Sequence, residues 1–282
     1  MQRICPIIVH ANGRTGSTLT MQLLATAKEI AVPMTPPFED RYLFFLHALA
    51  TLSSTDDAPM FLPDAIQQRP EVLNGLGYPL YHGFETGEFL DGQLFNAELQ
   101  KKLVEAFMAT VVEQYPQCEY YAEKSMGLSH PIYASDTSYK KIMLIRDPRD
   151  ILCSVMSFNK KRKFNAFSWL DDDTELSYCK RMMPSFREML SSSGTRSDDC
   201  LAIKYEALAL RLGDTAKEIG EWLGVELSPE VVIAQRDKFA GHMTSSTAEQ
   251  SVSKWKKQLS AASIAHFSEA IGSELKEAGY EE

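Results

Sequence analysis

The stretch ICPIIVHANGRTGSTL, residues 4–19, decides the fold class of this chain. Its first part, Ile4 to Val9, is a continuous apolar run bounded by turn residues, which is typical of a strand buried on both faces. Residues 11–16 contain two glycines and predict a loop. From Ser17 onward leucines recur at helical spacing, and Ser17 or Thr18 can cap the helix. The stretch therefore predicts a strand, a loop and a helix in succession.

The same alternation continues along the chain. We expect strands at 4–9, 120–122, 141–145 and 201–205, and helices from 17 and at 40–49, 97–115, 147–158, 176–192, 214–223 and 261–278. Residues 51–95 are rich in Pro, Gly, Asp and Gln and predict an irregular insertion, while 159–175 predict a charged connection. Strands that alternate with helices predict an α/β fold with a central parallel β-sheet flanked by helices on both faces.

The composition excludes several classes of protein. The 282 residues carry 29 Lys+Arg against 38 Asp+Glu, a net charge of −9, which argues against binding nucleic acid through a basic surface. No apolar run reaches membrane-spanning length, and the N-terminal run is too short for a signal peptide. Five cysteines are scattered without a CxxC pair, which is typical of reduced thiols. We therefore expect a cytoplasmic protein without a membrane span or a nucleic-acid partner.

The loop at residues 12–18 has the residue types of an anion site. Gly13 and Gly16 permit close approach of the backbone to a ligand, and Arg14 adds a cation beside the hydroxyls of Ser17 and Thr18. The unpaired N–H groups at the start of a helix favour a phosphate at the same place. The spacing matches neither a Walker A loop nor a dinucleotide-binding G-x-G-x-x-G. An ordinary turn between strand and helix remains the alternative.

A second candidate site follows the strand at 141–145. Arg146 ends that strand, Asp147 can cap the next helix, and Pro148 suits its first turn. Ser154 lies two turns into the helix, so Arg146 and Ser154 could hold one phosphate monoester between them. The alternative is structural: an Arg146–Asp pair, or Arg149 paired with an aspartate, would fix the same turn.

Together these two loops resemble those of the sulfotransferases that use 3′-phosphoadenosine 5′-phosphosulfate, whose fold resembles nucleotide kinases. Residues 13–18 match the family's 5′-phosphosulfate loop, which implies that Gly13, Arg14, Thr15, Gly16, Ser17 and Thr18 bind the donor. Residues 146–150 with Ser154 match its 3′-phosphate motif, including the spacing from arginine to serine.

Weaker matches follow in the order of the family. Glu123-Lys124-Ser125 resembles its Glu-Lys-Ser/Thr segment, and Tyr205-Glu206-Ala207-Leu208 resembles its Tyr-Glu-x-Leu segment. Residues 251–255 resemble the Ser-x-x-x-Trp segment of bacterial members, after a similar stretch at 242–245. The resemblance implies that the donor also contacts Tyr205, Ser251, Ser253, Lys254 and Trp255. Trp255 could instead anchor the last helix in the core.

The sequence departs from the family at two positions. Arg14 stands where cytosolic members usually carry lysine, and Met126 stands where they carry a catalytic histidine, two residues after Lys124. Another group must then take the acceptor's proton. Our candidate is Glu39, because several bacterial sulfotransferases carry a glutamate in that region.

Glu39 could have a structural role instead, and two histidines are other candidates for the base. Glu39 could instead compensate the dipole of the helix that follows it, together with Asp40. His47 and His130 are weaker candidates for the base. Arg14 and Lys124 are the expected cations of the reaction.

The resemblance implies one sulfotransferase domain over residues 1–282, with 51–95 and 158–175 as insertions or a lid on the acceptor side. The expected reaction moves a sulfuryl group from 3′-phosphoadenosine 5′-phosphosulfate to a hydroxyl, less readily an amine, of a small-molecule, carbohydrate or lipid acceptor. It leaves 3′-phosphoadenosine 5′-phosphate (PAP) and needs no metal. The alternatives are a P-loop-like nucleotide or small-molecule kinase and a non-catalytic nucleotide-binding protein. We expect a bacterial-type enzyme; a homo-oligomer is left open.

Overall fold

The computed structural model describes residues 4–33, 37–51, 92–126, 132, 137–235, 247 and 249–280. Most of the predicted irregular insertion, residues 52–91, lies outside this part of the chain. The candidate base His130 and the stretch 242–245 lie outside it as well.

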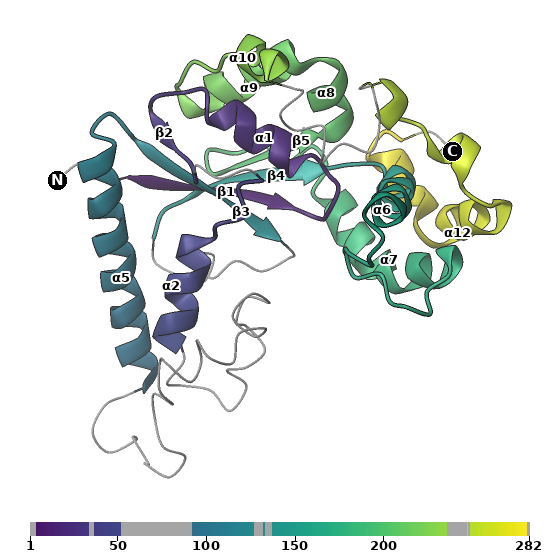
Figure 1. Ribbon diagram of the computed structural model, residues 1–282, viewed down its shortest axis with the longest axis horizontal. Helices are drawn as coiled ribbons and strands as arrows, with labels where there is room; N and C mark the ends of the chain where they lie inside the picture. Colours follow the sequence, from purple (N-terminus) through teal and green to yellow (C-terminus); the bar gives the residue numbers. More distant parts are fainter. Residues whose placement is uncertain are drawn as a thin grey trace.

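A parallel sheet forms the centre of the described structure (Figure 1). Its five strands run in the order β2-β3-β1-β4-β5, and every neighbouring pair is parallel. The strands are β1 (Cys5–Ala11), β2 (Ile30–Ala31), β3 (Tyr120–Met126), β4 (Lys140–Ile145) and β5 (Cys200–Lys204). Because β1 lies between β3 and β4, the segments that leave these three strands emerge at one edge of the sheet.

Helices cover both faces of the sheet, as the alternation predicts. They are α1 (Ser17–Leu24), α2 (Tyr42–Thr51), α5 (Gly92–Gln114), α6 (Pro148–Arg162), α7 (Glu175–Ser191), α8 (Tyr205–Leu210), α9 (Leu212–Leu223), α10 (Pro229–Ala234), α11 (Trp255–Gln258) and α12 (Ala261–Glu277). A short 3₁₀ turn covers Glu249–Ser251. Side chains of β1 alternate between the two layers: Ile7 and Val9 pack with α1 and α9, whereas Ile8 packs with α2 and α5. A third cluster joins α6, α7 and α12 (Figure 1).

The two helices that follow the candidate loops begin in different ways. Asp147 caps α6 by accepting a hydrogen bond from Arg149 N, with Pro148 in the first turn, as predicted. The prediction for α1 was wrong, because neither Ser17 nor Thr18 provides a side-chain cap. Gly16 takes the N-cap position with φ of 96°, a left-handed conformation that glycine adopts without strain.

Several boundaries differ from the sequence-based expectations. Helix α5 begins at Gly92, so residues 92–95 are helical rather than irregular. Strand β3 continues to Met126, and α6 continues to Arg162. Strand β2 and helices α8, α10 and α11 were not predicted; they have 2, 6, 6 and 4 residues. Elements this short contain too few residues for a hydrophobic period to show.

Candidate active site

Four cationic side chains gather at the edge of the sheet where β1, β3 and β4 end. Arg14 comes from the loop after β1, Lys124 from β3, Arg146 from the residue after β4, and Lys254 from the segment before α11. Lys124, Arg146 and Lys254 are only 1%, 3% and 8% exposed. We call these four residues the cationic cluster.

The two loops that the sequence singled out meet at Arg14. Its Nε donates a hydrogen bond of 3.1 Å to Ser154 Oγ on α6. The Arg14 carbonyl oxygen in turn accepts a hydrogen bond of 2.5 Å from the guanidinium of Arg146. Arg14, Ser154 and Arg146, predicted from two separate motifs, therefore form one site.

Arg146 is held in place on three sides. Its Nη2 donates to the carbonyl oxygen of Ser251 at 2.7 Å, and its guanidinium lies 3.9 Å from the centre of the Tyr205 ring. Tyr205 completes the contact by donating its hydroxyl proton to Ser251 Oγ at 2.8 Å. The remaining nitrogen, Nε, is buried and has no hydrogen-bond partner among the described residues. A buried donor without a partner is costly, so this atom favours an acceptor such as a phosphate oxygen.

The segment 251–255 reaches the cluster because Asp150 ties it to α6. The Asp150 carboxylate accepts from Ser253 N at 2.6 Å and from Trp255 N at 3.0 Å. Burial, together with the charge of Asp147, raises the pKa of Asp150 above its usual value. This role of Asp150 was not predicted, because no local pattern joins residues so far apart in the chain.

Arg149 and Trp255 pack together beside this tether. The Arg149 guanidinium pairs with Asp147 at 2.8 Å, which is the structural pairing that the sequence analysis held open. The same guanidinium lies 3.7 Å from the centre of the Trp255 ring, and Trp255 is 5% exposed. Trp255 is thus buried against α6, whereas the alternative role given for it was to anchor the last helix in the core. Its contact with a donor stays a prediction.

The charges of the cluster act on one another. Burial, and next the charge of Arg146, lowers the pKa of Arg14 to about 10. The same two causes, in the same order, lower the pKa of Lys254. Because the charged forms of Arg14 and Lys254 are destabilised by burial and by a neighbouring cation, a bound anion would stabilise the site.

Lys124 connects the loop at residues 12–18, which we call the phosphate loop, to the candidate base Glu39. Its Nζ donates to Thr18 Oγ1 at 3.0 Å and to the carbonyl oxygen of Pro37, and lies 3.5 Å from a carboxylate oxygen of Glu39. Burial lowers the pKa of Lys124 to about 8, although the Glu39 carboxylate opposes this shift. The structure thus brings Glu39 and Lys124 together, as their proposed roles require.

Glu39 lies further from α2 than expected, because the helix was predicted from residue 40 and begins at Tyr42. The N–H groups of Leu43 and Phe44 are instead bound by the buried carboxylate of Glu123, at 3.0 and 3.3 Å. Glu123 therefore takes the role at the helix N-terminus that was the main alternative for Glu39. Only the Glu-Lys-Ser segment pointed to Glu123, and nothing in it indicated this contact.

The structure also places three other predicted residues of the loop, and the alternative base His47. Thr15 is buried and donates its hydroxyl proton to the carbonyl oxygen of Asn12 at 2.7 Å. Ser17 is the first residue of α1, and a Cβ atom on Gly16 would lie 2.7 Å from the Tyr205 ring. The alternative base His47 is half-buried on α2.

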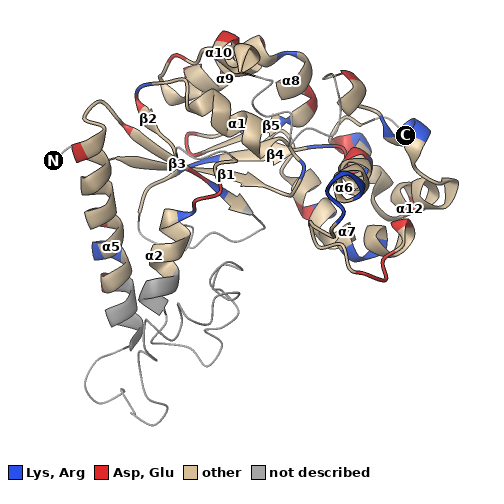
Figure 2. Cartoon of the chain, in the orientation of Figure 1, with Lys and Arg blue, Asp and Glu red and all other residues tan. Residues whose placement is uncertain are grey.

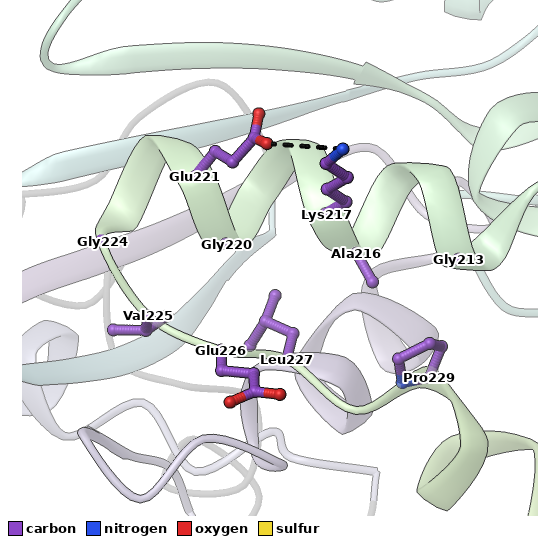
Figure 3. Close-up of a pocket in the computed structure, with 10 residues that line it drawn as sticks. All are labelled: Gly213, Ala216, Lys217, Gly220, Glu221, Gly224, Val225, Glu226, Leu227 and Pro229. Carbon is purple, nitrogen blue, oxygen red and sulfur yellow. Dashed lines mark ion pairs between the residues drawn. The ribbon is translucent and has the colours of Figure 1, made fainter.

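The described residues were also searched for metal sites, membrane-spanning helices and cavities. Within the described residues, no group of three or more His, Cys, Asp or Glu side chains could hold a metal ion. A helix long and apolar enough to cross a membrane is likewise absent from the described ranges. A hollow of about 540 Å³ lies along α9 and is lined mainly by glycine and aliphatic residues, with the Lys217–Glu221 ion pair at its rim (Figure 3). It shares no residue with the cationic cluster.

Known proteins share the parallel-sheet fold described above. The sequence profile of the sulfotransferase family matches residues 6–229. A search of curated proteins returns no significant match. The sulfotransferase domain from the curacin biosynthetic pathway aligns with a TM-score of 0.52 and 15% identity, over 100% of this chain and 99% of that one.

Two further solved structures are similar. The sulfotransferase domain from the Synechococcus PCC 7002 olefin synthase aligns with a TM-score of 0.50 and 18% identity, over 96% of both chains. Retinol dehydratase in complex with androsterone and the inactive cofactor PAP aligns with a TM-score of 0.51 and 14% identity, over 100% of this chain and 84% of that one. At such identities the structural likeness shows the fold alone.

Proposed function

Because the chain belongs to the sulfotransferase family, we propose that it transfers a sulfuryl group from 3′-phosphoadenosine 5′-phosphosulfate to a hydroxyl, less readily an amine, of a small-molecule, carbohydrate or lipid acceptor. The observation that carries the proposal is the meeting of Arg14, Ser154 and Arg146, with the unpaired Nε of Arg146 buried among them. That arrangement suits a doubly charged phosphate, which accepts several hydrogen bonds at once.

We assign the two ends of the donor to two parts of the cluster. Arg146, Ser154 and the segment 251–254 would hold the 3′-phosphate, because their donors and cations converge there. The loop at 13–18 and Lys124 would hold the 5′-phosphosulfate beside the start of α1. The solved complex of retinol dehydratase with PAP supports the same class of donor.

The chemistry then assigns roles to three side chains. The acceptor oxygen attacks sulfur, the bond from sulfur to the bridging phosphate oxygen breaks, and its electron pair stays on the 5′-phosphate. The acceptor's proton passes to the Glu39 carboxylate. Arg14 and Lys124 stabilise the negative charge that develops on the leaving phosphate.

We also propose that residues 1–282 form one domain. The profile ends at residue 229, yet Asp150 binds Ser253 and Trp255 to α6, and α12 packs on α7. Residues 51–95 and 158–175 remain our candidates for the acceptor side.

The proposal is tested by titration calorimetry with PAP and with ADP, each with and without Mg²⁺. The wild-type protein is compared with Arg146→Ala and Ser154→Ala, and with Arg187→Ala as the control, since Arg187 pairs with Glu274 on the surface. We expect PAP to bind without metal, and the first two variants to bind it at least about tenfold more weakly. Arg187→Ala should match the wild type. Preference for ADP with Mg²⁺ would overturn the proposal in favour of the kinase alternative, and failure to bind PAP would also overturn it.

A further inference from the structure

The ring of Phe167 lies directly on the phosphate loop. A Cβ atom built on Gly13 would be 2.3 Å from Cδ1 of Phe167, far inside van der Waals contact. The ring therefore occupies the space that any other side chain at position 13 would need. This contact joins the loop to a segment more than 150 positions away in the sequence.

Phe167 and Phe158 together enclose the guanidinium of Arg14. Its central carbon lies 4.9 Å from the centre of the Phe158 ring and 5.5 Å from that of Phe167. The two rings meet edge to face, with their centres 5.1 Å apart. With Ser154 accepting from Nε, the guanidinium has both an aromatic environment and a fixed hydrogen-bond direction.

Phe167 belongs to a segment built in an unusual conformation, residues 163–170, which we call the strap. Lys163, Phe167 and Ser168 all have positive φ, at 60°, 57° and 61°. Non-glycine residues persist in this region only where their surroundings enforce it. The strap follows the basic end of α6, which is blue in Figure 2.

Two neighbouring helices hold the strap against the loop. Asn159 of α6 accepts from Ala166 N at 3.1 Å and donates to the Ala166 carbonyl oxygen at 3.4 Å. Tyr178 of α7 donates its hydroxyl proton to the Phe167 carbonyl oxygen at 2.9 Å and stacks on Trp169. The position of Phe167 is thus fixed by contacts on both sides of it.

We propose that Phe167, supported by Phe158, is a positioning residue that holds the Arg14 guanidinium for the reaction, in an aromatic clamp that depends on the planar shape of the guanidinium. A planar guanidinium stacks on aromatic rings and keeps its hydrogen-bond direction, whereas an ammonium group on a flexible stem does not. The inference rests on the proposed function for its kinetic consequence, but the clamp itself can be tested without any ligand.

The first test uses the ligand-free protein. Phenylglyoxal modifies exposed arginines, and peptide mass spectrometry gives the rate at Arg14. We expect a severalfold faster modification of Arg14 in Phe167→Leu than in the wild type. Phe164→Leu is the matched control, because Phe164 lies on the same strap but is 56% exposed and contacts Phe158 rather than Arg14. Equal rates in Phe167→Leu and the wild type would overturn the clamp.

The second test is a double-mutant cycle on turnover. We expect Phe167→Leu to lower kcat about fivefold in the wild-type background, in line with the strength of a cation–π contact, with little change in the KM of the donor. In the Arg14→Lys background the same substitution should lower kcat less than twofold, by the same reasoning. A merely structural role would give the same loss in both backgrounds, which would overturn the proposal.

Two further variants keep the test decisive. Phe167→Tyr should retain the wild-type rate of Arg14 modification, because it keeps the ring. Phe167→Met fills a similar volume without a ring and should behave like Phe167→Leu, which covers the case that the leucine variant unfolds. If PAP fails to bind, the proposed function fails, while the modification rates still decide whether the clamp exists.

Discussion

Lys124 and Glu39 form an ion pair of 3.5 Å in which the lysine is almost fully buried and the glutamate is 46% exposed. Thr18 and the Pro37 carbonyl oxygen fix the ammonium group on its other sides. The cation is thus held beside the phosphate loop, while the carboxylate remains open to a second molecule. This asymmetry is what a donor on one side and an acceptor on the other require.

Replacing the exposed member of this pair should stop proton transfer. We expect Glu39→Gln to lower kcat by about 10²–10⁴, the usual contribution of a general base, with the affinity for PAP unchanged. Asp40→Asn is the matched control, since it removes a neighbouring exposed carboxylate. Steady-state kinetics and calorimetry check both; an equal loss in the two variants would refute the role of Glu39.

The pH dependence of the reaction should depend on Lys124. Its pKa of about 8 means that the charge is present at neutral pH and is lost above about 8, so kcat/KM should fall there. In Lys124→Arg this alkaline limb should move to higher pH. A limb that stays near pH 8 in this variant would assign it to another group.

The lowered pKa of Lys124 makes folding stability rise with pH, whereas it makes activity fall. The folded-state pKa of Lys124 lies below its ordinary value of 10.5, so the unfolded chain binds more protons between the two values. This residue therefore makes stability rise with pH across that window, while activity declines. Urea unfolding at pH 7.5 and 9.5, in the wild type and Lys124→Met, measures this contribution.

Substitutions at Gly16 and Gly194 distinguish the cost of backbone strain from the cost of a steric clash. Both glycines have positive φ, at 96° and 77°, but only at Gly16 would an added Cβ atom meet other side chains, those of Tyr205 and Leu208. We expect Gly194→Ala to cost about 1 kcal/mol in the free energy of unfolding and Gly16→Ala about 1–3 kcal/mol more. Only Gly16→Ala should weaken PAP binding, because it displaces the ring that supports Arg146. Equal effects on PAP affinity would contradict this expectation.

The Asp150 tether should be needed for binding. Asp150→Ala leaves the N–H groups of Ser253 and the buried Trp255 without an acceptor, at a cost of about 1–3 kcal/mol in unfolding free energy. Affinity for PAP should fall with it, because Ser251 loses its position against Arg146. Asp172→Ala, in an exposed acidic loop, is the control and should behave like the wild type. An Asp150→Ala protein that retains full affinity would show that the tether is dispensable.

The fold was predictable where local chemistry decides it. Adjacent residues predict the buried strand before Gly13 and the start of α6 at Asp147 and Pro148. Both predictions were confirmed. Strand β2 could not be found, because Ile30 and Ala31 alone have no period. The cap of α1 was predicted wrongly: Gly16 is at the N-cap position, where a hydroxyl residue was expected. The Tyr205 ring leaves no room for a Cβ atom there.

Only the site residues that belong to a short sequence motif could be predicted. Arg14, Ser154 and Arg146 each lie in a motif, and the parallel sheet brings those motifs to one edge. Glu123, Asp150 and Phe167 act across long separations in sequence, through contacts that exist only after the chain has folded. Their residue types alone, an acid or an aromatic in ordinary surroundings, carry no mark of these contacts.

The contact between Arg146 and the Ser251 carbonyl oxygen also sets an order of events during synthesis. Ribosomes make the chain from its N-terminus, so the phosphate loop and all of the sheet emerge before residue 251 exists. A partly made chain thus has the loop and three of the four cations but lacks the segment that holds Arg146. We expect nascent chains to gain affinity for PAP only after residues 251–255 have docked on α6, which makes donor binding a late reporter of correct folding.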